Sequence, residues 1–302
     1  MSTGLGWNVV DDARQLLAFH FMLNALRAGT IVAVVSGAIG YFMVLRRQSF
    51  VGHTLAVIGF PGAAAATYLG LATPLGYFGF CVAGALVIAA LPAGGRASAG
   101  GFAGESAAVG TVQGFALACG FLFVSLYKGF LSGLNNLLFG SIVGVTDGQV
   151  VTLFVAGALC LAVLAVIGRR LLFASIDPDV ARARGVPVRL LSAMFLVVLG
   201  VAAAGTSQVT GSLLVFALLV APAATAARLT ARPLTGLVLS VLIAVAVTWA
   251  GEGVAFFSSY PIGFWVTTFA FGLFVLAGGY RAVADAVGNR RFARTAVAAV
   301  GT

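Results

Sequence analysis

The sequence predicts an all-α fold, a transmembrane helical bundle of eight or nine spans, because of its composition, its long apolar runs and the placement of its basic residues. Hydrophobic residues make up 61% of the 302 residues and charged residues only 8%, whereas a soluble domain has about 25% charged residues. A soluble fold of this composition would lack the polar side chains needed to cover its surface. The composition therefore excludes a soluble globular protein and favours a single transmembrane domain, residues 1–302, embedded in a lipid bilayer.

The Lys and Arg residues are confined to short gaps between apolar runs. With nine spans, all of them except Arg14, Arg27 and Lys128 fall on one side of the bilayer, as the positive-inside rule requires of the cytoplasmic side. The polar N-terminal tail, residues 1–15, is then outside and the C-terminal tail, residues 281–302, is cytoplasmic. Eight spans would put the N-terminus inside. The same bias explains the net charge of +9, so no nucleic-acid partner is expected.

Nine runs approach the roughly 20 apolar residues that a helix needs to cross the hydrocarbon core. The first covers residues 16–45 and contains Arg27. It is either one tilted span or an interfacial segment at 20–26 followed by a span at 28–45. The other runs are 55–71, 75–93, 107–126, 150–167, 190–204, 212–227, 234–256 and 262–279. Only a short, mildly polar gap separates the sixth run from the seventh, so the number of spans stays at eight or nine.

The longest charged segment between apolar runs, residues 169–190, predicts a short helix. Asp177 suits the N-cap, Pro178 the first helical position and Asp179 the positive end of the helix dipole. Gly185 suits the C-terminal end. These features describe either a well-capped solvated loop or a docking element for a cytoplasmic partner.

Few ionisable side chains lie within the apolar runs, and such residues are candidates for function by default. His53 is either a pathway residue or an interfacial histidine beside the basic pair Arg46–Arg47. Glu252 either receives a cation near the outer surface or faces water. His20 lies between two phenylalanines and suits an interfacial aromatic belt. The three cysteines have no CxxC spacing and are expected to be packing residues.

The sequence lacks the patterns of an enzyme or of a resident cofactor site. It contains no GxxxxGK[ST] motif, so any ATP hydrolysis must come from another chain. Its two histidines and few carboxylates form no HExxH or paired arrangement, which makes an intramembrane enzyme the least favoured class. A closed metal site is not expected either, since tight binding would slow release of a transported ion.

Several short motifs follow one another in order between residues 24 and 279. They are Asn24-Ala25-Leu26, 40–50, Phe60-Pro61-Gly62, 105–110, Leu138-Phe139-Gly140, 175–181 with Gly185, 211–226 and Pro261-Ile262-Gly263. In this order and spacing they resemble the permease subunits of metal-ion ABC transporters, which import zinc, manganese or iron. The segment 211–226 is the most specific of these matches.

This resemblance implies a homodimer or heterodimer in a prokaryotic-type cytoplasmic membrane, with ATPase subunits on the cytoplasmic side and an extracytoplasmic metal-binding protein that delivers the ion. The permease would hold no resident cofactor; a divalent metal is its cargo, and ATP binds to the partner subunit. The residues expected to couple to the ATPase are Asp177, Pro178, Asp179, Ala181 and Gly185. The residues expected along the translocation pathway are His53, Glu252, Gly211, Ser212 and Pro222.

The chain departs from the family at one position that matters for metal binding. Members commonly carry an Asp after the first span and a His four residues later. Aligned on Gly52 and Pro61-Gly62, these positions are His53 and Val57 here. Residues four apart face the same side of a helix, so the usual pair becomes a single imidazole. His53 can still bind a transition metal, and a permease for a metal chelate or another substrate is the alternative.

Overall fold

The computed structural model describes residues 19–91, 101–127, 144–211, 215–258 and 260–300, with backbone only at 101–105, 209–210 and 285–300. These described ranges contain helices and no strand. The helices are α2 (His20–Leu45), α3 (Ser49–Tyr68), α4 (Thr73–Ala90), α5 (Gly101–Leu126), α7 (Asp147–Ile176), α8 (Pro178–Ala183), α9 (Val188–Thr210), α10 (Val215–Leu229), α11 (Pro233–Phe257) and α12 (Ile262–Val300).

Eight of the described helices are long and apolar enough to cross a membrane, which confirms the predicted fold class. The exception among the apolar helices is α10, which has 15 residues. At 1.5 Å per residue it is about 22 Å long, shorter than the roughly 30 Å of hydrocarbon. It occupies the seventh predicted run, whose first residues, 212–214, lie outside the described residues, so eight against nine spans stays a prediction. Ser212 lies outside the described residues.

Helix α2 is continuous through Arg27, which favours the single tilted span over an interfacial segment. One face of α2 carries small residues at a spacing of four: Gly29, Ala33 and Gly37. A Cβ at Gly37 would collide with the backbone of α11, and the Ser240 hydroxyl of α11 donates to the Gly37 carbonyl oxygen at 2.7 Å. Small residues allow this close approach where no hydrophobic force drives helices together.

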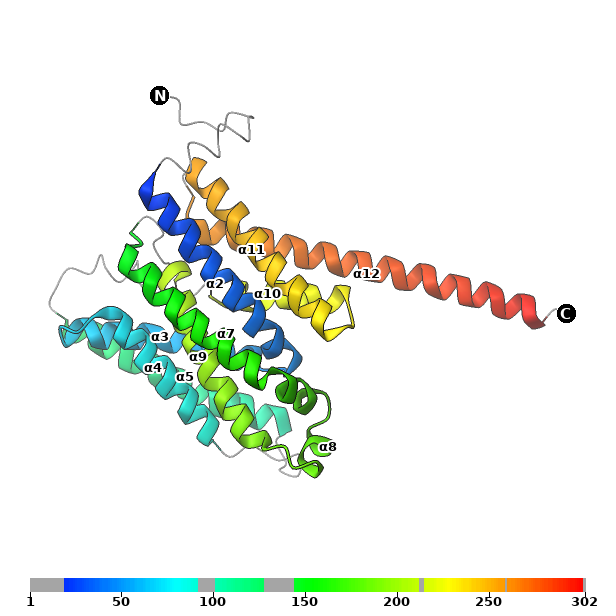
Figure 1. Ribbon diagram of the computed structural model, residues 1–302, viewed down its shortest axis with the longest axis horizontal. Coiled ribbons are helices and arrows are strands. Elements are labelled where there is room, and N and C mark those ends of the chain that lie inside the picture. Colours follow the sequence, from blue (N-terminus) through cyan, green and yellow to red (C-terminus); the bar gives the residue numbers. More distant parts are fainter. Residues whose placement is uncertain (1–18, 92–100, 128–143, 212–214, 259, 301–302) are drawn as a thin grey trace.

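The long helices pack as two groups, with α9 between them. Helix α2 packs mainly against α7, α10 and α11, whereas α3 packs mainly against α4 and α5, and α9 contacts members of both groups (Figure 1). Within the second group the backbones of α3 and α4 touch. A Cβ at Gly62 would overlap the carbonyl oxygen of Gly76, and a Cβ at Gly76 would overlap that of Gly62.

The bundle has two ends that differ in what they present. Helix α8 lies at the end where α2 finishes, here called the α8 end, and α2 begins at the opposite end, where α11 finishes (Figure 1). Arg228 lies over the ring of Phe274, 3.9 Å from its centroid, and Arg281 donates to the Arg228 carbonyl oxygen at 3.0 Å. These two contacts tie α10 to α12, which continues beyond the rest of the bundle (Figure 1).

Candidate translocation and coupling sites

Helix α8 begins as the sequence predicts. Asp177 is the N-cap, and its carboxylate accepts from the backbone N–H groups of Asp179 at 3.1 Å and Val180 at 3.0 Å. Pro178 occupies the first helical position, where a missing N–H has no cost. These contacts satisfy backbone donors that a six-residue helix would otherwise leave open.

The C-terminal end of α8 is a Schellman motif. The N–H of Gly185 donates to the Arg182 carbonyl oxygen at 2.9 Å, and the N–H of Val186 donates to the Ala181 carbonyl oxygen at 3.0 Å. Gly185 has a φ of +77°, a left-handed conformation that a residue with a Cβ adopts only at a cost. The sequence-based limits of this helix are therefore confirmed at both ends.

The residues of α8 divide between an inner and an outer face. Ala181 is fully buried against the bundle, so it anchors the helix and is not available to a partner. Val180, and Ile176 at the end of α7, are exposed apolar side chains. Beside them Arg182 donates to Asp179 at 3.1 Å in an exposed ion pair. The outer face of α8 thus combines apolar contact area with charges of both signs.

Arg46 connects the helices on either side of α8 to the turn between α2 and α3. Its guanidinium donates to the hydroxyl of Ser192 in α9 at 2.6 Å and to that of Ser175 in α7 at 3.4 Å. It also donates to Gln48 at 3.1 Å and lies over the ring of Phe195, 5.5 Å from its centroid. A planar guanidinium has donors enough for all of these partners at once. In the sequence, Arg46 is a topology marker and part of the motif at 40–50, and neither feature predicts these contacts.

His53 lies in the first turns of α3, close to this turn. Its Nδ1 is buried and has no hydrogen-bond partner among the described residues. Its ring meets the edge of Phe216 in α10, with centroids 5.3 Å apart. Val57, one turn further along α3, is buried and apolar, so it supplies no second ligand side chain.

Prolines interrupt both of the helices that meet at His53. Pro61 lies within α3 and Pro222 within α10. A proline has no N–H to give to the carbonyl four residues earlier, here those of Val57 and Leu218. Gly211, at the end of α9, has a φ of +78° and lets the chain turn toward α10. Interrupted helices at membrane depth occur where the backbone is buried or lines a cavity.

Glu252 lies near the opposite end of the bundle from His53, so the structure does not bring these two predicted residues together. Its side chain is 1% exposed, and neither carboxylate oxygen has a partner among the described residues. The carboxylate occupies the space where Gly29 of α2 has no side chain. One turn away, the Trp249 indole donates to the Thr30 hydroxyl at 2.8 Å and fixes the same two helices.

His20 also lies at this end and does more than belong to an aromatic belt. Its Nε2 is 3.4 Å from a carboxylate oxygen of Asp147 at the start of α7, and Asn24 donates to the same oxygen at 2.8 Å. The spacing of His20 and Asn24 on one helix face was visible in the sequence. Asp147, more than 120 residues away, carried no signal that linked it to them.

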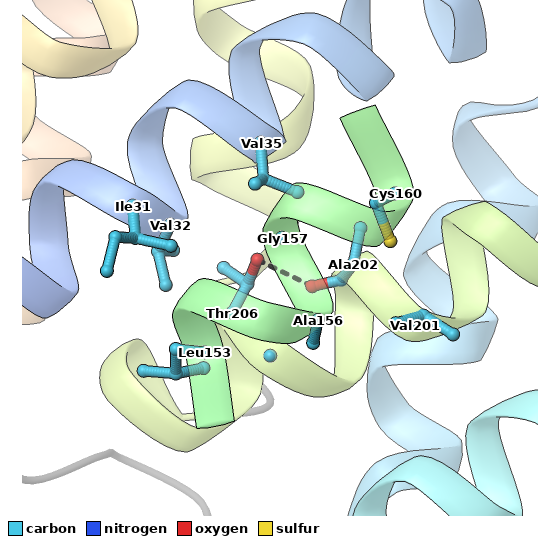
Figure 2. A pocket seen from close by; sticks show the side chains of 11 residues that line it. Ile31, Val32, Val35, Leu153, Ala156, Gly157, Cys160, Val201, Ala202 and Thr206 are labelled. Atoms are coloured by element: carbon cyan, nitrogen blue, oxygen red, sulfur yellow. Dashed lines mark hydrogen bonds between the residues drawn. The ribbon is translucent and has the colours of Figure 1, made fainter. Parts of the chain in front are cut away.

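A small cavity between α2, α7 and α9 offers no ion site. Its volume is about 10 Å³, and its walls are almost entirely apolar (Figure 2). The hydroxyl of Thr206 donates to the Ala202 carbonyl oxygen at 2.8 Å and is 2.9 Å from the Ser36 hydroxyl. Cys160 at its edge is a buried free thiol in contact with the Val198 carbonyl oxygen, as expected of a packing residue.

Among the described residues, no group of three or more His, Cys, Asp or Glu side chains could hold a metal ion. What the described residues offer is isolated donors: an imidazole at the His53 position, a buried carboxylate at Glu252 and the group around Asp147.

Comparison with known proteins decides the family. The model of the ABC 3 transport family matches residues 18–280. The chain belongs to the ABC 3 transport family. It is therefore a multi-pass membrane permease, and the resemblance seen in its motifs is confirmed.

Relatives of known name share about three tenths of their residues with this chain. The manganese import system permease protein ScaB of Streptococcus gordonii is 30% identical over 208 residues, which cover 69% of this chain and 72% of that protein. The manganese transport system membrane protein MntC of Halalkalibacterium halodurans is 28% identical over 237 residues, covering 78% and 79%.

A solved structure of the same fold is PsaBC from Streptococcus pneumoniae in complex with Fab. The match has a TM-score of 0.78 and 26% sequence identity, and it covers 89% of this chain and 95% of that chain. The arrangement of helices described above is thus that of an ABC permease over nearly its whole length.

Proposed function

We propose that this chain is the translocating subunit of an ATP-driven importer for a divalent transition-metal ion, with manganese as the first candidate. Two permease copies would pair with cytoplasmic ATPase subunits, and an extracytoplasmic binding protein would deliver the ion. The names of the relatives support manganese, and zinc and iron are the other candidates. The observation that carries the proposal is the capped helix α8, presented at one end of the bundle in a chain of this family.

The α8 end is the cytoplasmic end in this proposal. Arg46, Arg182 and Arg228 all belong to it, in keeping with the excess of basic residues in cytoplasmic loops. The N-terminus is then extracytoplasmic and the C-terminus cytoplasmic. The exposed Ile176 and Val180 would insert into an ATPase groove, while Asp179 and Arg182 would form the polar rim of that contact.

Coupling between the ATPase and the pathway would run through Arg46. A displacement of α8 moves the end of α7 and the start of α9, and both carry hydroxyl groups bound to the Arg46 guanidinium. Arg46 precedes α3, so the movement reaches the helix that bears His53. Charge-assisted hydrogen bonds are short and directional, which suits the transfer of a small displacement.

The ion would enter beside Glu252 and leave past His53. Glu252 supplies a carboxylate and His53 an imidazole, both with unpartnered atoms in the described part of the chain. Between them Gly211 and the proline-interrupted helix α10, with Pro222, offer backbone carbonyl groups. Few strong ligands along the way would let the ion leave as readily as it enters.

The test is uptake by proteoliposomes that contain the permease, its ATPase and its binding protein. Manganese uptake should require ATP inside the vesicle, and zinc or iron should compete if they share the route. His53→Ala should lower the rate of uptake, whereas Thr111→Ala, an exposed hydroxyl bound only within its own helix, should not. Uptake that continues without ATP would contradict the proposal.

A metal-chelate permease is the second candidate, because His53 and Val57 replace the carboxylate and imidazole usual in metal-ion members. The double variant His53→Asp, Val57→His restores that pair. If the wild-type chain carries the free ion, the double variant should keep or raise manganese uptake. Uptake by the wild-type chain of a ferric chelate but not of free manganese, zinc or iron would favour the second candidate.

A further inference from the structure

The group around Asp147, at the end of the bundle opposite α8, has the composition of a cation site. His20 and Asn24 come from the first two turns of α2, and Val145 and Asp147 come from the start of α7. The His20 Nε2 is 3.4 Å from the Asp147 Oδ1. The Asn24 amide nitrogen donates to the same oxygen at 2.8 Å and to the Val145 carbonyl oxygen at 3.4 Å.

One buried atom in this group has no hydrogen-bond partner in the described part of the chain. Asn24 is 3% exposed, and its Oδ1 has no hydrogen-bond partner among the described residues. A buried amide oxygen without a partner costs free energy. A half-turn of the amide would exchange its oxygen and nitrogen, and the Oδ1 would then face the Asp147 carboxylate and the Val145 carbonyl. Three oxygens repel one another at such close range unless a cation lies between them.

We propose that the side chains of His20, Asn24 and Asp147, with the Val145 carbonyl, form a transient extracytoplasmic site for a divalent cation. The amide of Asn24 holds the site closed when it is empty and turns its oxygen inward when the ion arrives. Manganese prefers oxygen ligands, and this site offers three oxygens and one imidazole nitrogen. It lacks the soft sulfur ligands that select zinc or copper(I). The site rests on the proposed function in so far as its ion is the transported one.

Two features keep this site weak, as a transfer site must be. His20 and Asp147 side chains are both 72% exposed, so water competes for the ion. The positive charge of Arg27, which is exposed on α2, also acts on Asp147. Gly29 lies five residues beyond Asn24 on the same helix, about 7.5 Å along its axis, and there the unpartnered Glu252 carboxylate is the next ligand.

The test is manganese binding to the purified full-length permease in lipid nanodiscs without an ATPase. The His53→Ala, Glu252→Gln background removes the other candidate ligands, and loss of the free-ion paramagnetic resonance signal reports binding. Asp147→Asn should weaken binding by about tenfold or more. Gln149→Ala, at the same helix end but turned to Thr146, should leave the affinity unchanged.

The decisive variant is Asn24→Asp, because the two explanations of the group predict opposite results. A cation site gains charge, so manganese affinity should rise and manganese should raise the unfolding temperature more than in the parent chain. A purely structural group gains only repulsion between two carboxylates, so unchanged or weaker manganese binding in this variant would overturn the proposal. Failure here would leave ATP-dependent uptake intact, whereas failure of the proposed function would appear in the uptake assay.

Discussion

The two ends of the bundle differ in how many of their polar side chains have hydrogen-bond partners. At the α8 end, Arg46 binds three side-chain partners and an aromatic ring, and Asp177 and Gly185 cap α8. The Nδ1 of His53 is the exception there, since it is buried without a partner among the described residues. At the other end, both oxygens of Glu252 and one of Asn24 are buried without partners among the described residues. A fully hydrogen-bonded network holds its side chains in one geometry, whereas a buried polar atom without a partner is available to bind a ligand. The contrast supports the proposal that the α8 end couples to the ATPase and that the opposite end receives the ion.

The largest effect is expected where the unpartnered carboxylate meets α2. In Gly29→Ala the new methyl group would overlap the Glu252 carboxylate, so the buried Glu252 side chain must move or α2 and α11 must separate. Overpacking of this kind costs about 1–3 kcal/mol, and uptake should be lost. Thermal unfolding and uptake would be measured together.

The chain offers a matched control for that substitution. Gly253→Ala adds the same methyl group one residue from Glu252, where nothing lies within 4 Å, and should change stability little. Glu252→Ala should restore the stability of Gly29→Ala without restoring uptake. If the double variant were no more stable than Gly29→Ala, the steric explanation would be wrong.

The second-largest effect is expected at the α8 end, where Arg46 is hydrogen-bonded. Arg46→Ala removes three hydrogen bonds and a ring contact, and hydrogen bonds to charged groups contribute about 1.5–3 kcal/mol each at most. The ATPase should still bind α8, but its ATP turnover should no longer respond to the loaded binding protein. Arg47→Ala removes the same charge at the next, exposed position and should keep the response. Equal loss of the response in both variants would count against Arg46 as the link.

The third effect concerns the cap of α8. Asp177→Ala removes the acceptor of two backbone N–H groups and should cost the helix about 1 kcal/mol. Because α8 is short, this cost appears as fraying, and association with the ATPase should weaken while the protein stays in the membrane. Co-purification of the two subunits measures it. The Asp177→Asn variant keeps an acceptor. If it associates with the ATPase as strongly as the wild-type chain does, capping is the cause.

The smallest effect is expected from the exposed ion pair of α8. Asp179→Ala breaks the exposed contact with Arg182, and exposed ion pairs along a helix contribute about 0.3–0.5 kcal/mol. Thermal unfolding should be unchanged within error. A loss of stability as large as that of Asp177→Ala would mean that the charges of α8 matter to the bundle and not only to a partner.

Sequence reasoning found the features that depend on neighbours in the chain. The nine apolar runs and the caps at Asp177 and Gly185 follow from local chemistry, and the structure has helices there. The burial of Ala181, the reach of Arg46 to Ser192 and the meeting of His20 with Asp147 depend on residues far apart in sequence. No periodicity encodes such pairs, because helix packing creates them.

The same limit explains Glu252. Its position near the end of an apolar run left open whether it faced water. The structure buries it because Gly29, more than 200 residues earlier, leaves room for a carboxylate between two helices. A glycine in a membrane helix is usually interpreted as a packing residue. The neighbouring sequence does not show which glycine leaves space for a carboxylate from another helix.

The contact between Gly62 and Gly76 limits how the permease can change shape. With no side chain between the backbones of α3 and α4, neither helix can rotate about its own axis without colliding with the other. The two helices are therefore expected to move together. A rearrangement that moves His53 therefore moves α3 and α4 together. The number of independent motions open to the bundle is then smaller than its number of spans.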